Sequence, residues 1–192
     1  MAEKTMGERM RPEVVVLLGG RIRAVRRERG LSVVGLAGLS GVSRRMLTQI
    51  ELGQANPSVA TVDRIAAALG TTFPALAGVL GEGPPDGVEV WSAPNGSWAR
   101  LLQAVETGEV FVEMWKWHLV AGDRYRASPI EGAPASMAHV LRGRLRVRTG
   151  ERERYVGAGG SARIESTADH TFEAGSDAAD FLWVVTMPRT AA

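Results

Sequence analysis

Residues 41–57 read GVSRRMLTQIELGQANP, and this stretch decides how the first part of the chain folds. Gly41 suits a tight turn, because glycine adopts backbone angles that other residues avoid. Ser43 is placed to cap a helix in which Leu47 and Ile50 share one apolar face. A second glycine, at position 53, ends that helix. The stretch therefore predicts a turn, a short helix and a looped exit.

Helical periodicity surrounds this stretch on both sides. Apolar residues recur at helical spacing from Val14 onwards, and glycines separate five short helices between residues 14 and 80. Ser32 and Ser58 are placed to cap the second and fourth helices, and the fifth spans residues 73–80. The first helix carries an arginine-rich face that we expect to point outward: Arg21, Arg23, Arg26, Arg27 and Arg29. A glycine turn between the second and third helices makes this a helix-turn-helix arrangement.

In a helix-turn-helix, the first residues of the second motif helix reach base edges in the major groove. Arginine can bind guanine with two hydrogen bonds, and polar side chains and amides near helix ends bind phosphates. Contacts of Arg44 and Arg45 with phosphates instead of bases remain an alternative. The predicted DNA-contacting residues are Ser43, Arg44, Arg45, Thr48, Gln54 and Asn56.

Charge and composition agree with a polyanionic partner for the first part. The net charge of the 192 residues is only +2, but residues 1–80 hold 11 basic against 6 acidic side chains. A basic solvated surface is the alternative explanation. The chain has no cysteine, which excludes disulfides and thiolate metal sites. Without a long apolar run or a signal peptide, we expect a cytoplasmic protein with no membrane partner.

The run of residues 18–76 resembles the Cro/C1-type (XRE) helix-turn-helix family. The resemblance implies a DNA-binding regulator, against the alternative of a helical bundle with no role on DNA. Gly35, Gly38 and Val33-Val34 depart from the family's pattern in the second helix. The matching pieces are the arginine-rich first helix, Leu31-Ser32, Gly41-Val42-Ser43, Ile50-Glu51, Gly53, Pro57-Ser58 and Ile65-Ala66.

A change of periodicity marks a second domain. Residues 1–13 are predicted to be a flexible arm, 14–80 the helical domain, 81–88 (GEGPPDGV) a linker and 89–192 a β domain. Glu109–Leu119 alternates as a strand and places Glu113, Trp115 and Trp117 on one face. Further strands are expected at 153–156, 161–164, 170–173 and 179–186, which favours a barrel or sandwich.

Residues 139–148, HVLRGRLRVR, are predicted to form one strand. His139 lies on the apolar face of that strand, together with Leu141, Leu145 and Val147. The other face carries four arginines, which we interpret as a solvated surface, with an anion site as the alternative.

The β domain resembles the cupin family, a double-stranded β-helix related to jelly rolls. The fold class is therefore α+β multidomain, an all-α domain followed by an all-β cupin barrel. Together the two resemblances imply a regulator that dimerises through its cupin domains. The residues that carry the cupin resemblance are 119–122, 139–147, 155–161, 167–170 and 181–185.

Metal-binding cupins offer two histidines and a glutamate in one motif and a histidine in a second. Here the first-motif positions hold Ser128, Pro129, Ile130, Glu131 and Ser136, and only His170 matches the second motif. We therefore expect no metal, no cofactor and no catalytic residues. A metal held by His139 and His170 with Glu113 or Glu131, in an epoxidase- or oxygenase-like enzyme, is the alternative.

A barrel without a metal can hold a small molecule among aromatic walls. The predicted function is a sequence-specific DNA-binding transcriptional regulator, with repression as the expected sign. We expect it to bind a palindromic operator as a homodimer and to sense a small-molecule effector. A DNA-binding protein that uses an empty barrel only for dimerisation is another alternative. The predicted ligand-binding residues are Glu113, Trp115, Trp117, Met137, His139, His170 and Trp183.

Overall fold

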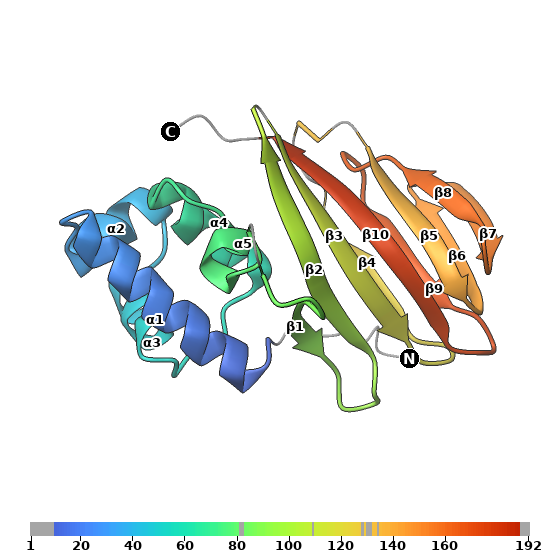
Figure 1. Cartoon of the computed structure of the whole chain (residues 1–192), viewed down its shortest axis with the longest axis horizontal. Coiled ribbons are helices and arrows are strands. Elements are labelled where there is room, and N and C mark those ends of the chain that lie inside the picture. Colours follow the sequence, from blue (N-terminus) through green and yellow to red (C-terminus); the bar gives the residue numbers. More distant parts are fainter. Residues whose placement is uncertain are drawn as a thin grey trace.

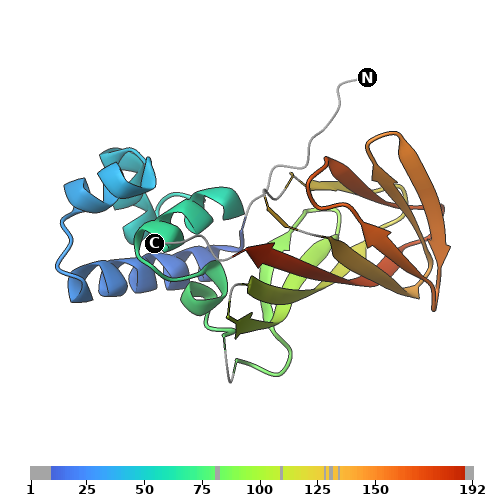
Figure 2. The same cartoon turned by 90° about the horizontal axis from the view of Figure 1, so that it is seen from above.

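The computed structural model describes residues 10–80, 83–108, 110–127, 129, 132–133 and 135–188. A helical unit and a β unit of two sheets lie end to end (Figure 1). Seen from above, the helices gather at one end and the two sheets face each other at the other end (Figure 2). The expected all-α domain followed by an all-β domain is therefore confirmed.

The helical unit contains the five predicted helices. Ser32, Ser43 and Ser58 each cap a helix by accepting a backbone N–H three residues ahead. Gly41 turns the chain between the second and third helices with a φ of 64°. Among the described residues, no helix is both long and apolar enough to cross a membrane. The helices are α1 (Pro12–Glu28), α2 (Val33–Ser40), α3 (Arg44–Glu51), α4 (Val59–Ala68) and α5 (Phe73–Ala77).

The start of the chain is more ordered than the predicted flexible arm. Helix α1 begins at Pro12, which suits the first helical turn because proline has no N–H to satisfy there. Met10 is buried, and its backbone pairs with Trp91 in a β-bridge. Burial of the Met10 side chain and this pairing explain the difference; residues 1–9 lie outside the described part.

The arginine-rich face of α1 does not point outward as a whole, and the prediction is wrong for Arg26. Arg26 is buried and forms an ion pair with Glu51 at the end of α3, with 2.8 Å between Nη2 and Oε2. Arg21 donates to the Leu76 carbonyl and Arg29 to the Gly70 carbonyl. These three arginines therefore tie the helices together, because each has a backbone or carboxylate acceptor within the unit.

The β unit is built from ten strands in the described residues. One sheet has the order β1-β2-β3-β10-β5-β8 and the other β4-β9-β6-β7, with every pair antiparallel. Phe172, Phe181 and Leu101 are fully buried in the unit. This is the two-sheet arrangement expected from the cupin resemblance. The strands are β1 (Val88–Ser92), β2 (Trp98–Thr107), β3 (Val110–Leu119), β4 (Arg124–Ala127), β5 (Ser136–Arg142), β6 (Arg144–Thr149), β7 (Arg152–Gly157), β8 (Ser161–Ile164), β9 (His170–Ala174) and β10 (Ala179–Pro188).

The stretch 139–148 is two strands, not the single strand that was predicted. Gly143 turns the chain between β5 and β6 with a φ of 75°, and these strands lie in different sheets. A Cβ at Gly143 would lie 2.1 Å from the Ala178 carbonyl oxygen, so glycine is required there. Because the turn shifts the alternation, Ala138 and Val140 point inward and His139 points outward.

The helical unit docks directly on the β unit. Phe73 of α5 stacks on Trp115 of β3, with ring centroids 6.2 Å apart and planes 6° from parallel. Arg11 forms an ion pair with Glu89 of β1 at 3.0 Å. The predicted linker ends where β1 begins at Val88, and its residues 81–82 lie outside the described part. These contacts place one end of the β unit against α5 and the start of α1.

Candidate functional site

Helix α3 presents two arginines to solvent. Leu47 and Ile50 are fully buried and hold the helix against the rest of the unit, so its opposite face is exposed. Arg44 and Arg45 are exposed, and within the described residues neither guanidinium group forms a hydrogen bond or an ion pair. Two unpaired guanidinium groups at the start of a helix can bind phosphate or a base edge.

The other predicted DNA-contacting residues differ in their availability. Ser43 accepts the Met46 N–H at 3.2 Å, and Thr48 is exposed while its hydroxyl donates to the Arg44 carbonyl at 2.9 Å. Gln54 is exposed beyond the helix end.

Asn56 was predicted to bind phosphate, but its amide is used inside the protein. Its Oδ1 accepts from the Met10 N–H at 3.0 Å, and its Nδ2 donates to the Met10 carbonyl at 2.6 Å. A contact 46 residues away in sequence has no local pattern that could have indicated it. Asn56 therefore holds the start of the chain in place.

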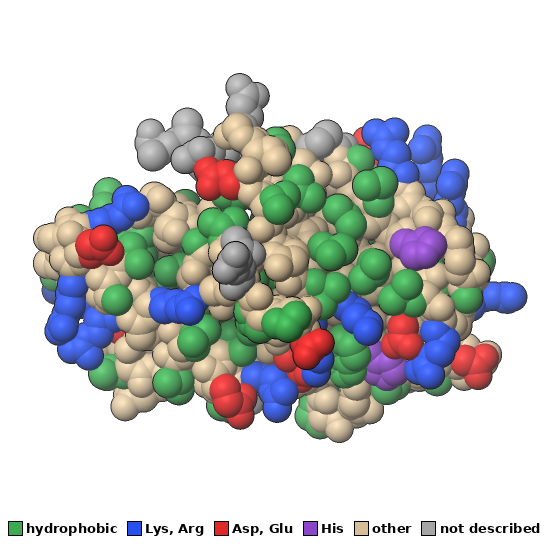
Figure 3. All heavy atoms as spheres, viewed as in Figure 1, with side chains coloured by type: hydrophobic (Ala, Val, Ile, Leu, Met, Phe, Trp, Pro, Cys, Tyr) green, Lys and Arg blue, Asp and Glu red, His purple; other side chains and the backbone are tan. Residues whose placement is uncertain are grey.

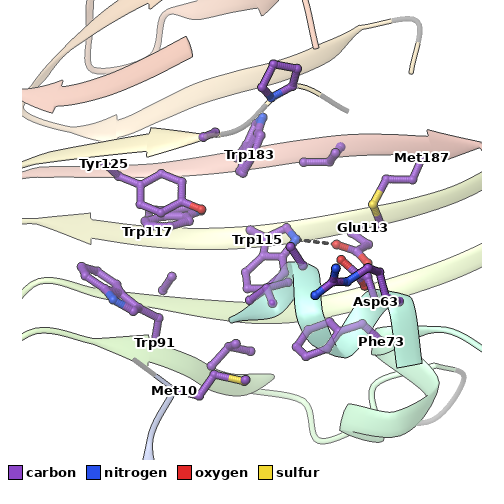
Figure 4. Close-up of a pocket in the computed structure, with 18 residues that line it drawn as sticks. Met10, Asp63, Phe73, Trp91, Glu113, Trp115, Trp117, Tyr125, Trp183 and Met187 are labelled. Carbon is purple, nitrogen blue, oxygen red and sulfur yellow. Dashed lines mark hydrogen bonds between the residues drawn. The ribbon is translucent and has the colours of Figure 1, made fainter. Parts of the chain in front are cut away.

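A second site is a cavity of about 550 Å³ between the helical unit and one end of the β unit (Figure 4). The helices contribute one wall and the inner face of the six-stranded sheet another. The size lies in the range of sites for small organic ligands. The lining residues are Met10, Val59, Ala60, Asp63, Arg64, Phe73, Val90, Trp91, Ala99, Glu113, Trp115, Trp117, Tyr125, Ala127, Pro129, Trp183, Val185 and Met187.

Four of the predicted ligand-binding residues line this cavity: Glu113, Trp115, Trp117 and Trp183. The first three lie on β3, where strict alternation buries every second side chain. Met137 and His139 lie on the outer face of β5 instead, because the turn at Gly143 sets a different phase from the one predicted. This corrects their placement.

His170 lies behind the cavity wall and does not line it. Its ring packs edge-on against Trp183, with centroids 5.4 Å apart, and its Nδ1 lies 3.0 Å from the Ala168 carbonyl oxygen. Its Nε2 is buried with no hydrogen-bond partner among the described residues. Burial lowers the pKa of His170, so the neutral ring is favoured there.

The two histidines proposed for the alternative metal site do not lie together. His139 is exposed on the outer face and contacts Ser161, with Nδ1 and Oγ 2.9 Å apart, whereas His170 lies inside the β unit. Glu131 lies outside the described residues. No group of three ionisable metal ligands lies close together in the described part of the chain. The donor set that a metal cupin needs therefore does not fit the residues described.

The cavity contains two neighbouring carboxylates whose closeness was not predicted from the sequence. Glu113 is 4% exposed; its Oε2 accepts from Trp115 Nε1 at 2.8 Å, and its Oε1 has no hydrogen-bond partner among the described residues. Asp63 of α4 lies beside it (Figure 4). Burial raises the pKa of Glu113 to about 8 and that of Asp63 to about 7, with the nearby Asp63 charge adding to the rise at Glu113.

These raised values predict how stability changes with pH. Both carboxyls keep protons in the folded state that the unfolded chain loses above about pH 4, so the free energy of unfolding falls between about pH 4 and 8. Replacing Glu113 with glutamine removes the part of this fall in unfolding free energy that comes from Glu113. At about pH 9 we expect Glu113→Gln to be more stable than the wild type, by at most about 5 kcal/mol, and at about pH 4 to match it.

Thermal unfolding at the two pH values measures this effect. Glu165→Gln is the control, because this carboxylate is exposed at the surface. Equal pH dependence in the wild type and Glu113→Gln would show that the Glu113 carboxyl is not buried in the uncharged form.

The family comparison concerns the helical unit. Residues 22–76 match the helix-turn-helix family HTH_3. The immunity repressor protein of Bacillus phage phi105 is 43% identical over 61 residues, which are 32% of this chain and 42% of the repressor. The chain therefore matches less than half the length of that relative.

One solved structure extends the likeness to both units of the chain. The HTH_3 family transcriptional regulator from Vibrio cholerae superposes with a TM-score of 0.66 and 26% identity, over 92% of this chain and 98% of that chain. The Cupin_2 domain of an XRE family transcriptional regulator from Enterobacter cloacae gives a TM-score of only 0.36, at 17% identity, over 38% of this chain and 79% of that chain.

Proposed function

We propose that this chain, an XRE-type helix-turn-helix regulator with a C-terminal cupin domain, binds a palindromic DNA operator as a homodimer and responds to a small molecule in its interdomain cavity. The observation that carries DNA reading is the pair of unpaired arginines, Arg44 and Arg45, at the exposed start of α3. The match to a phage repressor supports repression as the sign of regulation. The DNA partner supports a cytoplasmic location.

Selection from a random duplex pool tests this proposal. The purified chain should enrich one motif with two-fold symmetry, whose half-sites lie about one helical turn apart because two α3 helices enter successive major grooves. Enrichment of no motif would contradict sequence-specific reading. A motif without symmetry would contradict the homodimer but not the reading helix.

An apolar patch on the outer face of the six-stranded sheet supports dimerisation. Met114 of β3, Val184 of β10 and Met137 of β5 are neighbours across three strands and point outward together. Val105 and Leu141 extend the patch and, like Met137, are exposed. Figure 3 shows hydrophobic side chains gathered over this face. A second copy related by a two-fold axis would bury the same patch on both chains.

Charges placed in this patch should separate the dimer. Met137→Asp combined with Leu141→Asp would bring like charges together across the two-fold axis, and we expect the dimer to dissociate at least about 100-fold more readily. Light scattering after size exclusion should then give the mass of one chain. Tyr155→Asp is the control, since Tyr155 is exposed on β7 of the other sheet. A wild-type monomer, or a dimer that survives the double change, would contradict this interface.

The cavity supports a sensing role because it lies where the two units meet. A ligand changes DNA occupancy only if it binds the two arrangements of the helical units with different affinity. Asp63 and Phe73 belong to the helical unit, whereas Glu113 and Trp117 belong to the β unit. A molecule in the cavity would therefore touch both. We propose binding rather than catalysis, and stoichiometric iron or zinc in the purified protein would contradict that choice.

A further inference from the structure

The walls of the cavity are aromatic on several sides. Trp117 packs against Tyr125 with ring centroids 4.2 Å apart and against Trp91 at 5.8 Å, and Phe73 stacks on Trp115. These rings come from β1, β3, β4 and α5, so they surround the space instead of forming one wall (Figure 4). The faces of such rings carry negative electrostatic potential and attract cations.

Two carboxylic acids are among the polar groups that line the cavity. Glu113 and Asp63 lie side by side at one end (Figure 4), and Glu113 Oε1 is buried without a hydrogen-bond partner among the described residues. Arg64 also lines the cavity, but it is exposed, and no ion pair joins it to either carboxylate in the described part. A buried carboxylate with no cation beside it is costly when charged, and a cationic ligand would supply both the opposite charge and a donor for Oε1.

We propose that the cavity binds a small organic ammonium ion, with its charged group between Glu113 and Asp63 and its apolar body against the tryptophans. This rests on the proposed sensing role and names the chemical class of the effector. An organic anion is disfavoured because its charge would meet the two carboxylates. The unpaired Trp117 Nε1, also buried, can donate to one oxygen acceptor elsewhere on the ligand.

Such a ligand would bridge the two units. Its charge would be shared by Asp63 on α4 and Glu113 on β3. Helix α4 packs against α2, and α2 packs against α3, so the position of α4 constrains the reading helix. Occupancy of the cavity would therefore favour one placement of α3 relative to the β unit.

Binding of the cation should also be linked to protons. The titratable and charged groups that line the cavity are Glu113, Asp63, Arg64 and Tyr125, with His170 behind Trp183. Because the two carboxyls hold protons near neutral pH in the empty cavity, a cation must displace protons when it binds. Affinity should therefore rise as the pH rises through about 7 and 8.

Calorimetric titration of the full chain without DNA tests the proposal. The probes are 2-phenylethylammonium, its neutral isostere 2-phenylethanol and the anion phenylacetate, which share an aromatic body. At about pH 8 the ammonium should bind at least about tenfold more tightly than the alcohol, and phenylacetate more weakly than both. Titrations near pH 7 in buffers of different ionisation enthalpy should show that the ammonium releases protons.

Two variants locate the charged end of the ligand. Glu113→Gln and Asp63→Asn should each weaken the ammonium at least about tenfold and leave the alcohol unchanged. Asp177→Asn, at an exposed carboxylate, should alter neither. Equal binding of ammonium and alcohol by the wild type would overturn the proposal even if a variant failed to fold. That result would leave binding to the selected duplex intact, whereas a failure of the proposed DNA reading would leave ammonium binding intact.

Discussion

Replacing Arg44 and Arg45 together with alanine is expected to abolish sequence-specific DNA binding by this chain. A dimer presents four such arginines, and each contact to a base edge or phosphate is worth about 1–3 kcal/mol. The combined loss in affinity for the selected duplex should therefore exceed about 1,000-fold. Fluorescence anisotropy with the labelled duplex measures it. Because both side chains are exposed and unpaired in the described structure, the thermal stability of the variant should not change.

Arg152→Ala with Arg154→Ala is the matched control for this experiment. It removes the same charge from exposed positions on β7, far along the chain from the helical unit. The control should bind the selected duplex within a few-fold of the wild type. Retained binding by the α3 variant would contradict the assignment of α3 as the reading helix.

Single variants separate base reading from phosphate contact. An arginine that reads guanine should, when replaced, relax the preference at one position of each half-site. An arginine that binds phosphate should, when replaced, weaken all duplexes alike and lower the salt dependence of binding.

Glu51→Ala is expected to destabilise the helical unit by about 3–5 kcal/mol, because it leaves the Arg26 charge buried without its partner. Arg26 donates to Glu51 through Nε and Nη2 and to the Leu31 carbonyl through Nη1, the last at 2.8 Å. The ion pair ties α1 to the end of α3, so its loss should also weaken DNA binding. The hydrogen bond with Glu51 raises the pKa of Arg26, which agrees with a stable ion pair.

The tryptophans allow this effect to be measured on the helical unit alone. All five lie in the β unit, at positions 91, 98, 115, 117 and 183. Urea unfolding followed by far-UV circular dichroism should therefore shift to lower concentration more than the tryptophan fluorescence does. Arg126→Ala, which breaks an exposed ion pair with Asp169, should cost only about 0–1 kcal/mol. A loss no larger than this control would contradict the role of the buried pair.

A double variant distinguishes a lost ion pair from lost packing. Arg26→Met with Glu51→Leu replaces both charges by apolar groups, so it should recover much of the stability lost in Glu51→Ala. If the double variant is as unstable as the single one, the uncompensated charge of Arg26 is not the cause.

Local patterns explain the features that were predicted from the sequence. The capping serines and the turn at Gly41 act within a few residues, so the helices could be located. Alternation along β3 needs no partner strand to be recognised, so the inward positions of Glu113, Trp115 and Trp117 follow from the sequence.

Three of the missed features depend on contacts that are distant in the sequence, and one depends on a strand break. The partner of Arg26 lies 25 residues away and that of Asn56 lies 46 residues away. His139 was misplaced because Gly143 separates two strands whose alternation differs in phase. In the sequence, Asp63 looks like any polar residue of an amphipathic helix. It lies near Glu113 only because the helical unit packs against the β unit.

The ratio of two dissociation constants distinguishes sequence-specific reading from general attraction to DNA. The wild-type chain should be titrated, at one salt concentration, with the selected palindromic duplex and with a scrambled duplex of equal length and composition. A sequence-reading dimer should bind the palindrome at least about 1,000-fold more tightly. A ratio within a few-fold of one would mean that α3 supplies only general attraction to phosphates, and would contradict the account of this chain as a sequence-specific regulator.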